Sequence, residues 1–347
     1  MNLEHLKLPN LKLASRALPQ PWLGMGVLLV LSDVHRAGAM EQGRRGFDSR
    51  AVANPFLRTF QRGYRRYVWM DDPMAHNHLL EAIVRRVPDP AWVVANGDFT
   101  LDTGFVGVSE EGAFESASEA IGILRRAYGG RLRCTMGDHD IGKKSFIGDS
   151  GGVRRRSLER CESDLGIPRL WHEDFPGWRW IGVTSTLAAW PVFRPETPEE
   201  EVGWWQENHV RHLEDIDRLF REATDAGMRT LLFCHDPTAL PFLRGLPGVA
   251  AALPGMGGTV IGHLHTRWVL RVGRVLAGVP KVSWAGHSIR RYTAALNEAG
   301  CWREFRVTLC PSPTGIQLLK DGGYLTSEWS ASGPQVSWKA HGLPWSG

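Results

Sequence analysis

The stretch Gly262-His263-Leu264-His265 follows the apolar run Thr259-Val260-Ile261, so a predicted buried strand ends by presenting two histidines. In an extended segment, side chains two positions apart project to the same side, and both imidazoles are then expected to face one point. Neutral imidazole is the commonest metal ligand among side chains. A lone His-x-His is often a surface accident, so the stretch gains meaning only if other strands end in the same way.

Four earlier stretches share this form, an apolar run followed by Asp or His. In chain order, these candidate ligands are Asp33 and His35 after 27–31, Asp98 after 91–95, Asp138 and His139 after 132–135, and His235 after 230–234. Continuous apolar strands are typical of a sheet covered on both faces. In α/β sheets, functional sites collect at the carboxyl ends of the strands. The sequence therefore predicts one site assembled from five strand ends.

The residue types in this predicted site suit a pair of divalent metal ions. Two such ions, roughly 3.5–4 Å apart, can clamp a phosphoryl group and deprotonate a water between them. The pair needs mixed oxygen and nitrogen ligands, a bridging carboxylate, and outer groups that orient the imidazole rings. Asp98 stands alone at its strand end and is the natural bridge.

The five blocks, D-x-H, G-D, G-D-H-D, H and G-H-x-H, resemble the signature of the calcineurin-like metallophosphoesterases over roughly residues 27–290. The resemblance implies an α/β fold, a four-layer α/β/β/α sandwich of two mixed sheets flanked by helices. It also implies a hydrolase that cleaves a phosphodiester or phosphomonoester, with a hydroxide between two metals as the nucleophile.

Carried over by position, the resemblance implies a role for each residue of the blocks. One metal would be bound by Asp33, His35, Asp98 and His265, and the other by Asp98, Asp138, His235 and His263. His139 would protonate the leaving oxygen or stabilise charge on it. Asp140 would orient the His139 ring.

Three details refine the resemblance. Asp138 stands where the family usually has Asn, and this third carboxylate is expected to tighten hard ions, which favours Mn²⁺ while Fe, Zn²⁺ and Mg²⁺ remain compatible. The segment 97–104 lacks the Arg of the Ser/Thr protein phosphatases, which disfavours that activity. The strand end at 184–186, the helix around Gly203 and Gln206, and the His235 block look more like the bacterial phosphodiesterase branch.

Two basic regions could contact an anionic substrate. Within residues 36–73, the seven arginines between positions 44 and 66 lie among aromatic side chains, and the segment is either a solvated insertion with its own packing cluster or a basic lid for an anion such as nucleic acid. Lys143, Lys144 and the cluster Arg154, Arg155 and Arg156 are candidate secondary contacts, although such clusters commonly face solvent.

Length and composition set the frame for these motifs. The 347 residues, 43% hydrophobic and 22% charged, are typical of a globular protein, and the net charge of +4 is mild. Five cysteines without CxxC spacing indicate reduced thiols and a cytoplasmic protein. Residues 1–20 contain no continuous apolar core, so neither a secretory signal nor a membrane segment is expected.

The expected organisation is an N-terminal extension (1–20), a metallophosphoesterase domain (21–290) and a β-rich C-terminal extension (291–347) packed on the same domain. Helices are predicted over 74–87, 117–127 and within 199–223, and a further strand over 178–184. Beyond about residue 266, the alternation of Phe305, Val307 and Leu309 with polar residues favours antiparallel strands.

Three functions remain open on the sequence. The first is a metal-dependent phosphoesterase for a small phosphorylated substrate. The second is a nuclease that uses the basic segment 36–73. The third is a binding scaffold without catalysis, which is disfavoured because every ligand position and His139 are filled. The residues do not indicate an oligomeric state.

Overall fold

Two five-stranded sheets form the centre of the structure, a computed structural model that describes residues 26–148, 150–282, 284, 287–330 and 336–345. The expected N-terminal extension, 1–20, lies outside the described residues. The first sheet has the order β10-β9-β1-β2-β3 and the second β4-β5-β6-β7-β8. In the first sheet β1 (Gly26–Leu31), β2 (Trp92–Asn96) and β3 (Leu132–Thr135) are parallel, whereas β9 (Gly323–Trp329) and β10 (Trp338–Gly342) are antiparallel additions.

The second sheet is also mixed. Its parallel strands are β5 (Trp178–Val183), β6 (Arg229–Cys234), β7 (Met256–Ile261) and β8 (Val307–Leu309), and β4 (Leu170–Phe175) pairs antiparallel with β5. The chain therefore builds two mixed sheets, which agrees with the predicted fold class.

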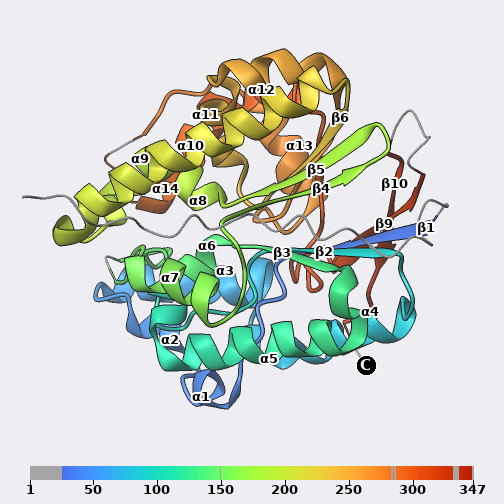
Figure 1. Cartoon of the computed structure of the whole chain (residues 1–347). Helices are drawn as coiled ribbons and strands as arrows, with labels where there is room; N and C mark the ends of the chain where they lie inside the picture. Colours follow the sequence, from blue (N-terminus) through green and yellow to red (C-terminus); the bar gives the residue numbers. More distant parts are fainter. Residues whose placement is uncertain (1–25, 149, 283, 285–286, 331–335, 346–347) are drawn as a thin grey trace, which may run out of the picture.

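Helices cover the outer faces of both sheets. In Figure 1 the long helix α5 (Glu111–Tyr128) runs with α4 (His78–Arg86) beneath the first sheet. The longest helix, α10 (Val202–Asp225), lies with α11 (Leu240–Arg244) and α12 (Pro247–Ala252) above the second. The order of layers is thus α/β/β/α, as predicted.

Shorter helical segments connect these layers. The α-helices are α1 (Ala39–Gln42), α2 (Phe47–Arg50), α3 (Pro55–Tyr64), α6 (Asp138–Ile141), α7 (Arg155–Ser163), α8 (Ser185–Ala188), α9 (Trp190–Phe193), α13 (Arg267–Val275) and α14 (His287–Asn297). The short 3-10 or π segments are η1 (Arg65–Trp69), η2 (Pro73–His76), η3 (Gly107–Ser109), η4 (Gly129–Arg131), η5 (Arg194–Glu196), η6 (Glu199–Glu201), η7 (Pro237–Ala239), η8 (Leu253–Gly255) and η9 (Ala299–Arg303). Among the described residues, no helix is both long enough and apolar enough to cross a bilayer.

The apolar run of β1 divides its side chains between two cores. Leu28 and Val30 belong to the core between the sheets, together with Trp180 of β5. Leu29 and Leu31 belong to the core between the sheets and the helices that cover their outer faces. All four leucine and valine side chains are fully buried. A strand covered on both faces needs apolar residues at successive positions, which explains why this run does not alternate.

Most predicted elements agree with the structure to within a few residues. The strand runs correspond to β1, β2, β3, β5 and β6, and the helix predicted over 117–127 is the central part of α5. The helix predicted over 74–87 is divided at Asn77 into the 3-10 turn η2 and the α-helix α4. The five cysteines are all buried and free, without a disulfide.

The prediction of antiparallel strands beyond residue 266 is wrong for the residues up to about 309. The chain forms the helices α13 and α14, and β8 pairs parallel to β7. Val307 and Leu309 are buried on one side, as their alternation indicates, but alternation does not specify the direction of the neighbouring strand. Farther along the chain β9 pairs antiparallel with both β1 and β10, and these two strands extend the first sheet. The expected boundaries near residues 20 and 290 stay a prediction.

Candidate metal centre

The carboxyl ends of β1, β2 and β3 in one sheet meet those of β6 and β7 in the other. Backbone hydrogen bonds continue the strand pairing past the strand ends: His35 donates to Asp98 O (3.0 Å) and Gly262 donates to His235 O (2.9 Å). The loops that carry the predicted ligands are therefore fixed by the sheets themselves.

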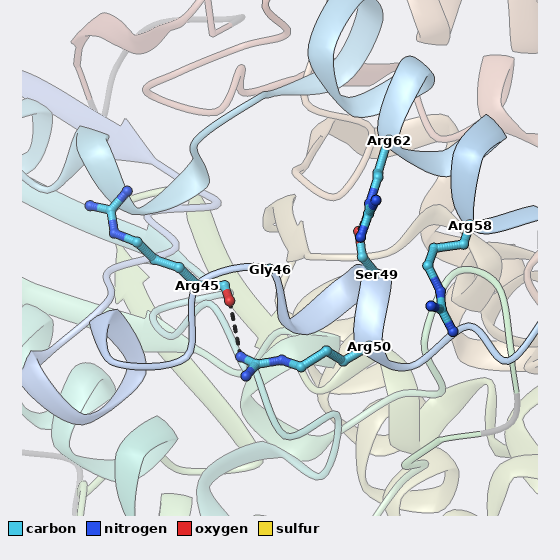
Figure 2. A pocket seen from close by; sticks show the side chains of 6 residues that line it. All are labelled: Arg45, Gly46, Ser49, Arg50, Arg58 and Arg62. Carbon is cyan, nitrogen blue, oxygen red and sulfur yellow. Dashed lines mark hydrogen bonds between the residues drawn. The ribbon is translucent and has the colours of Figure 1, made fainter. Parts of the chain in front are cut away.

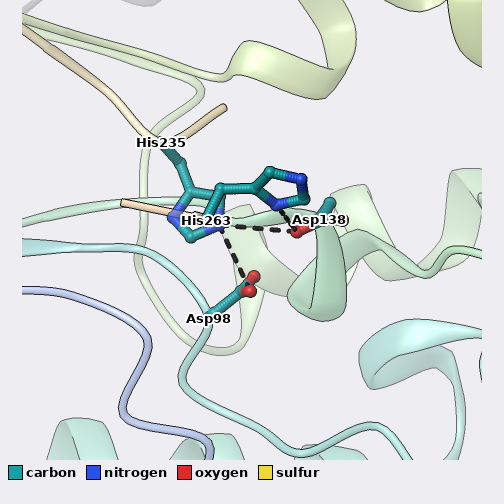
Figure 3. A group of neighbouring side chains, drawn as sticks. All are labelled: Asp98, Asp138, His235 and His263. Atoms are coloured by element: carbon teal, nitrogen blue, oxygen red, sulfur yellow. Dashed lines mark hydrogen bonds and ion pairs between the residues drawn. The ribbon is translucent and has the colours of Figure 1, made fainter. Parts of the chain in front are cut away.

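One set of side chains comprises Asp98, Asp138, His235 and His263, and we refer to it as the Asp98 group (Figure 3). His235 Nε2 lies 3.2 Å from Asp98 Oδ2 and 3.4 Å from Asp138 Oδ1. His263 Nδ1 lies 3.1 Å from Asp138 Oδ1. One ligand atom from each residue lies within 4.8 Å of the others, so one ion could contact all four.

A second set, the Asp33 group, comprises Asp33, His35 and His265. The Nε2 atoms of His35 and His265 lie 3.2 Å apart, and His265 Nε2 lies 3.5 Å from Asp33 Oδ1. Asp98 Oδ2 lies 3.8 Å from His35 Nε2, so this carboxylate is close to both groups. The structure thus brings together all seven predicted ligands, with Asp98 between the two sets.

The backbone at these ligands adopts an unusual conformation. Asp33, His35, Asp98, His263 and His265 all have positive φ values, between 47° and 60°. Non-glycine residues rarely adopt this left-handed conformation, and such strain concentrates at functional sites. The site therefore contains several strained residues that the surrounding sheets hold in place.

This conformation corrects the expectation for His263 and His265. The segment after β7 is not extended, because Leu264 N–H donates to Gly262 O and Thr266 N–H donates to Leu264 O, each across a tight turn. As a result the two imidazoles do not face one point. His263 belongs to the Asp98 group and His265 belongs to the Asp33 group.

Hydrogen bonds outside the two groups fix the orientation of the imidazoles. His235 Nδ1 donates to Asn96 O (2.7 Å), and His35 Nδ1 lies 3.3 Å from Thr100 O, in position to donate. A carbonyl oxygen can only accept, so in each neutral ring the Nε2 lone pair is left facing the centre. This is the arrangement in which an outer partner supports a metal-binding imidazole.

The donor set fits divalent ions on the evidence of its own buried atoms. Asp98 Oδ2 and His235 Nε2 are buried, and neither makes a hydrogen bond within the described part of the chain. Buried polar atoms in folded proteins normally have a hydrogen-bond partner, so two converging buried ligand atoms without one fit a bound ion. Carboxylate oxygens and imidazole nitrogens together suit Mn²⁺, Fe and Zn²⁺, and do not select one of them.

Electrostatics within the centre lead to the same conclusion. Burial opposes ionisation of Asp98, but His235 beside it lowers the pKa of the Asp98 carboxyl below its usual range. Burial tends to lower the pKa of His235, but the carboxylates of Asp98 and Asp33 raise it well above its usual value. Burial raises the pKa of Asp33. Carboxylates packed this closely need positive charge beside them, which divalent ions would provide.

Glycines allow the loops to approach one another. A Cβ at Gly137 would lie 2.0 Å from Asp98 Oδ1, and a Cβ at Gly262 would lie 1.9 Å from Ser32 Oγ. Real Cβ atoms do not approach other atoms so closely, so any larger residue would push a ligand loop outward. Both glycines directly precede a ligand-bearing turn.

The expected contact between Asp140 and the His139 ring is not formed. The Asp140 carboxylate accepts hydrogen bonds from the backbone N–H groups of Gly137 (2.9 Å), Asp98 (2.9 Å) and Phe99 (2.8 Å). It is the third residue of α6, where an acidic side chain turns back to the helix N-terminus. His139 Nδ1 instead donates to Leu101 O (2.8 Å). Asp140 therefore positions the loop of Asp98, not the ring of His139.

The candidate substrate contacts are in two different places. Lys143 and Lys144 line a cavity above the metal groups, and Lys143 Nζ lies 2.7 Å from Asp138 Oδ2. The arginines of the 154–156 cluster do not line this cavity. Arg155 pairs with Glu159 on α7, and Arg156 lies 3.9 Å from Glu111 at the surface. Arg154 Nη1 donates to Val153 O (2.9 Å).

Two residues near the centre were not among the predicted ones. Arg291 Nη1 lies 3.8 Å from Asp138 Oδ2, and its Nε lies 3.4 Å from Glu196 Oε1. Asp236 Oδ2 lies 3.8 Å from His263 Nε2. The position of Asp236 beside His235 could have identified it, whereas Arg291 lies on α14 and no sequence pattern connects it to the strand ends.

Comparisons with known proteins give a distant likeness. No family model matches the sequence, and no curated protein matches it. Among solved structures, 22 chains match, and one is the crystal structure of a dimetal phosphatase from Danio rerio. That likeness covers 91% of this chain and 96% of the other, with a TM-score of 0.46 and 13% sequence identity. At this distance the likeness assigns no activity to this chain.

Proposed function

We propose that this protein is a metal-dependent phosphoesterase that hydrolyses a phosphodiester or a phosphomonoester at a dinuclear centre. The observation that carries the proposal is the position of Asp98, whose Oδ2 lies 3.2 Å from His235 Nε2 in one group and 3.8 Å from His35 Nε2 of the other. A carboxylate between two sets of ligands is what two neighbouring ions require. The order of the five sequence blocks supports the same activity, and membership of the bacterial phosphodiesterase branch stays a prediction.

The two ions would supply a Lewis-acid clamp for the phosphoryl group and a water of lowered pKa. The chain's own cations lie beside this position. Lys143 and Arg291 both approach Asp138 and both line the cavity, so two cationic groups lie where an ester would enter. This charge favours binding of a phosphate group close to the ligands.

We infer that His139, which lines the cavity beside the candidate ligands, moves a proton at the leaving oxygen. Its Nδ1 donates to Leu101 O, so the neutral ring presents a Nε2 lone pair. Burial, and then the Lys143 ammonium, lower the pKa of His139 well below its usual value. We therefore infer that His139 takes up its proton at Nε2 only when an anionic ester lies beside it, and then passes that proton to the leaving oxygen.

Hydrolysis of a chromogenic pair tests the proposal. Metal-stripped protein is given Mn²⁺, and the release of nitrophenol is compared for 4-nitrophenyl phosphate and bis(4-nitrophenyl) phosphate. Turnover that requires the metal, and that falls at least ~100-fold in Asp98→Asn, is the expected result. Asp164→Asn, at an exposed carboxylate on the surface, is the matched control and should retain turnover.

The pair also separates the alternatives. Preference for the diester would identify a phosphodiesterase, and preference for the monoester a phosphatase. Two bound metals per chain without turnover of either ester would favour the binding scaffold. His139→Gln adds a second readout: turnover should fall ~10²–10⁴-fold with the metal content unchanged, and loss of metal would instead make His139 a ligand.

A nuclease is a second candidate because of one feature of the segment 36–73. Figure 2 shows Arg45, Arg50, Arg58 and Arg62 around a hollow of about 430 Å³. Arg45 pairs with Asp72, and Arg50 donates to the carbonyl oxygens of Arg44 and Arg45, so part of this charge is already engaged within the chain.

Salt dependence of DNA binding decides whether this hollow has such a role. If four arginines each neutralise one phosphate of duplex DNA, binding should weaken ~100-fold between 50 and 200 mM salt. The measurement is fluorescence anisotropy of a labelled duplex, with Arg58→Gln and Arg62→Gln as variants. A response to salt that is flat, or that these variants leave unaltered, rules out this nuclease interpretation.

A further inference from the structure

A cavity of about 470 Å³ is lined in part by histidines of the Asp98 group and the Asp33 group, which we together call the metal groups. Its floor includes His35, His139, His263 and His265. Cavities that bury drug-sized organic ligands usually have volumes of about 300–1,000 Å³. The space is therefore much larger than a phosphoryl group alone requires.

Aromatic rings form a continuous wall from the metal ligands to the mouth of this cavity. The Trp69 ring centroid lies 4.8 Å from that of His265, and the Tyr64 ring stacks on Trp69 at 6.3 Å. The Phe146 ring stacks in turn on Tyr64, with centroids 5.9 Å apart and planes 10° apart. The apolar surface thus begins at a metal ligand and ends at Phe146, which is 56% exposed.

Two helices from a distant part of the chain add further aromatic side chains to the lining of this cavity. Trp268 on α13 and Tyr292 on α14 both line the cavity, and their side chains are 57% and 40% exposed. Large aromatic side chains left exposed around one concave site are typical of ligand-binding surfaces. Leu264, between the two histidines, adds an apolar group on the floor.

Two cationic side chains of the lining lie beside the candidate ligands, because Lys143 and Arg291 both approach Asp138. Arg65 and Asp48 also line the cavity but pair with each other, and the exposed part of the lining includes Phe146, Trp268 and Tyr292. A ligand complementary to this arrangement has an anionic head and an apolar body. A nucleic-acid backbone, charged at every residue, does not match the aromatic walls.

We propose that the substrate is a phosphoester that carries a large apolar substituent, an alkyl chain or an aryl ring, and that the walls formed by Tyr64, Trp69, Phe146, Trp268 and Tyr292 bind this substituent. The inference rests on the proposed function and names its substrate class. The phosphoryl group lies at the two metal groups, and the apolar substituent extends from the Trp69 ring to the mouth of the cavity.

Binding of phosphonates tests the inference without turnover, because their C–P bond resists hydrolysis. Isothermal titration of Mn²⁺-loaded protein compares methylphosphonate, octylphosphonate and phenylphosphonate, each below its micelle-forming concentration. Burial of a methylene group contributes up to about fourfold in affinity, so octylphosphonate should bind at least ~100-fold more tightly than methylphosphonate. The phenyl compound distinguishes an aryl site from an alkyl site.

Variants locate the apolar group. Trp268→Ala should reduce the preference for octylphosphonate over methylphosphonate at least fivefold, and Phe146→Ala, at an exposed position, serves if Trp268→Ala fails to fold. Val275→Ala is the matched control, because Val275 lies on the same helix α13, is 84% exposed and does not line the cavity. It should leave the preference as in the wild type.

The outcomes separate this inference from the proposed function. Equal affinity for the three phosphonates overturns the inference, and so does a preference that both wall variants retain. A parallel series of methyl, octyl and phenyl 4-nitrophenyl phosphates reports turnover. If none of these esters is cleaved but the binding preference is present, the hydrolytic function fails while the apolar site stands.

Discussion

At the scale of single residues, the ion pair between Asp138 and Lys143 is a feature of this candidate metal centre that affects its charge. The carboxylate contributes to the Asp98 group through Oδ1, which faces His235 and His263, while Oδ2 faces Lys143 Nζ at 2.7 Å. The ammonium therefore neutralises part of the charge that Asp138 adds relative to an asparagine. Burial opposes ionisation of Asp138, but Lys143 lowers the pKa of its carboxyl well below the usual range.

We expect Asp138→Asn to lower the affinity for Mn²⁺ by ~10–100-fold, because it removes a charged ligand and leaves the Lys143 ammonium unpaired beside the ions. The double variant Asp138→Asn with Lys143→Gln should recover part of this affinity, with a coupling energy of ~1–3 kcal/mol. Isothermal titration with Mn²⁺ measures all three variants. Additive effects of the two substitutions would show that the pair does not act as a unit.

His212 provides a pH test away from the centre. Its ring is buried on α10, and burial, followed by the nearby Arg169, lowers its pKa to about 3. The unfolded chain has a histidine pKa of about 6.5, so the folded state binds fewer protons between these values. The free energy of unfolding therefore does not depend on the titration of His212 above pH 6.5. It decreases as the pH falls from 6.5 toward 3, because only the unfolded chain takes up the proton.

Between pH 7 and pH 5, this residue should cost the protein about 2 kcal/mol of unfolding free energy. In His212→Phe, the loss of stability over that interval should be smaller by this amount. Urea denaturation at the two pH values gives the comparison, with His172→Phe on β4 as the control. If the pH dependence is the same in His212→Phe as in the wild type, the pKa of His212 is not lowered in the folded state.

The aromatic side chains between the sheets act at the scale of elements. Trp329 on β9 lies with its ring centroid 4.8 Å from Trp180 and 5.1 Å from Trp178, both on β5 of the other sheet. Its neighbour Phe175 on β4 lies at 5.6 Å. Strand β9, added antiparallel to β1, therefore contributes a main contact between the two sheets.

Trp329→Ala should destabilise the protein by ~3–5 kcal/mol, because it removes a large buried ring and leaves a cavity between the sheets. The measurement is the urea midpoint and slope. Leu318→Ala, at a side chain that is 63% exposed, is expected to change stability by less than ~0.5 kcal/mol. A similarly small effect of Trp329→Ala would mean that the sheets repack without the ring.

At the scale of the whole molecule, the metal groups join the two sheets. Asp98 and Asp138 follow strands of the first sheet, while His235 and His263 follow strands of the second. An ion bound by all four would link the two halves of the sandwich, in addition to compensating the charge of the carboxylates.

Metal removal should therefore lower the thermal stability of the whole fold. At a Mn²⁺ concentration 100 times its dissociation constant, one site contributes ~2.7 kcal/mol, which corresponds to a rise in Tm of ~4 °C for a chain of this size. Calorimetric scans in EDTA and in Mn²⁺ give the shift. Asp98→Asn should show a smaller shift, and equal Tm values for the wild type in both buffers would contradict a link between the halves.

The candidate ligands that the structure brings together could be predicted from the sequence because each lies within a few residues of an apolar strand. His235 follows its strand directly, Asp33 and Asp98 lie two residues after theirs, and the carboxyl ends of neighbouring parallel strands must meet. The four-layer fold class followed from the resemblance that these blocks carry. This part of the centre could be predicted because each candidate ligand is close in the sequence to the strand that positions it.

Other features depend on contacts between segments far apart in the chain. The turns at His263 and His265, the bonds of Asp140 to the backbone, and the approach of Arg291 to Asp138 result from packing that local pattern does not encode. The same holds for the parallel pairing of β8 and for the aromatic cavity, whose walls come from the segment 47–73, from Phe146, and from α13 and α14. The sequence by itself thus determined which residues could bind metal, since strand ends carry them. Only the tertiary structure decided which residues surround them, because that depends on how distant helices pack over the sheets.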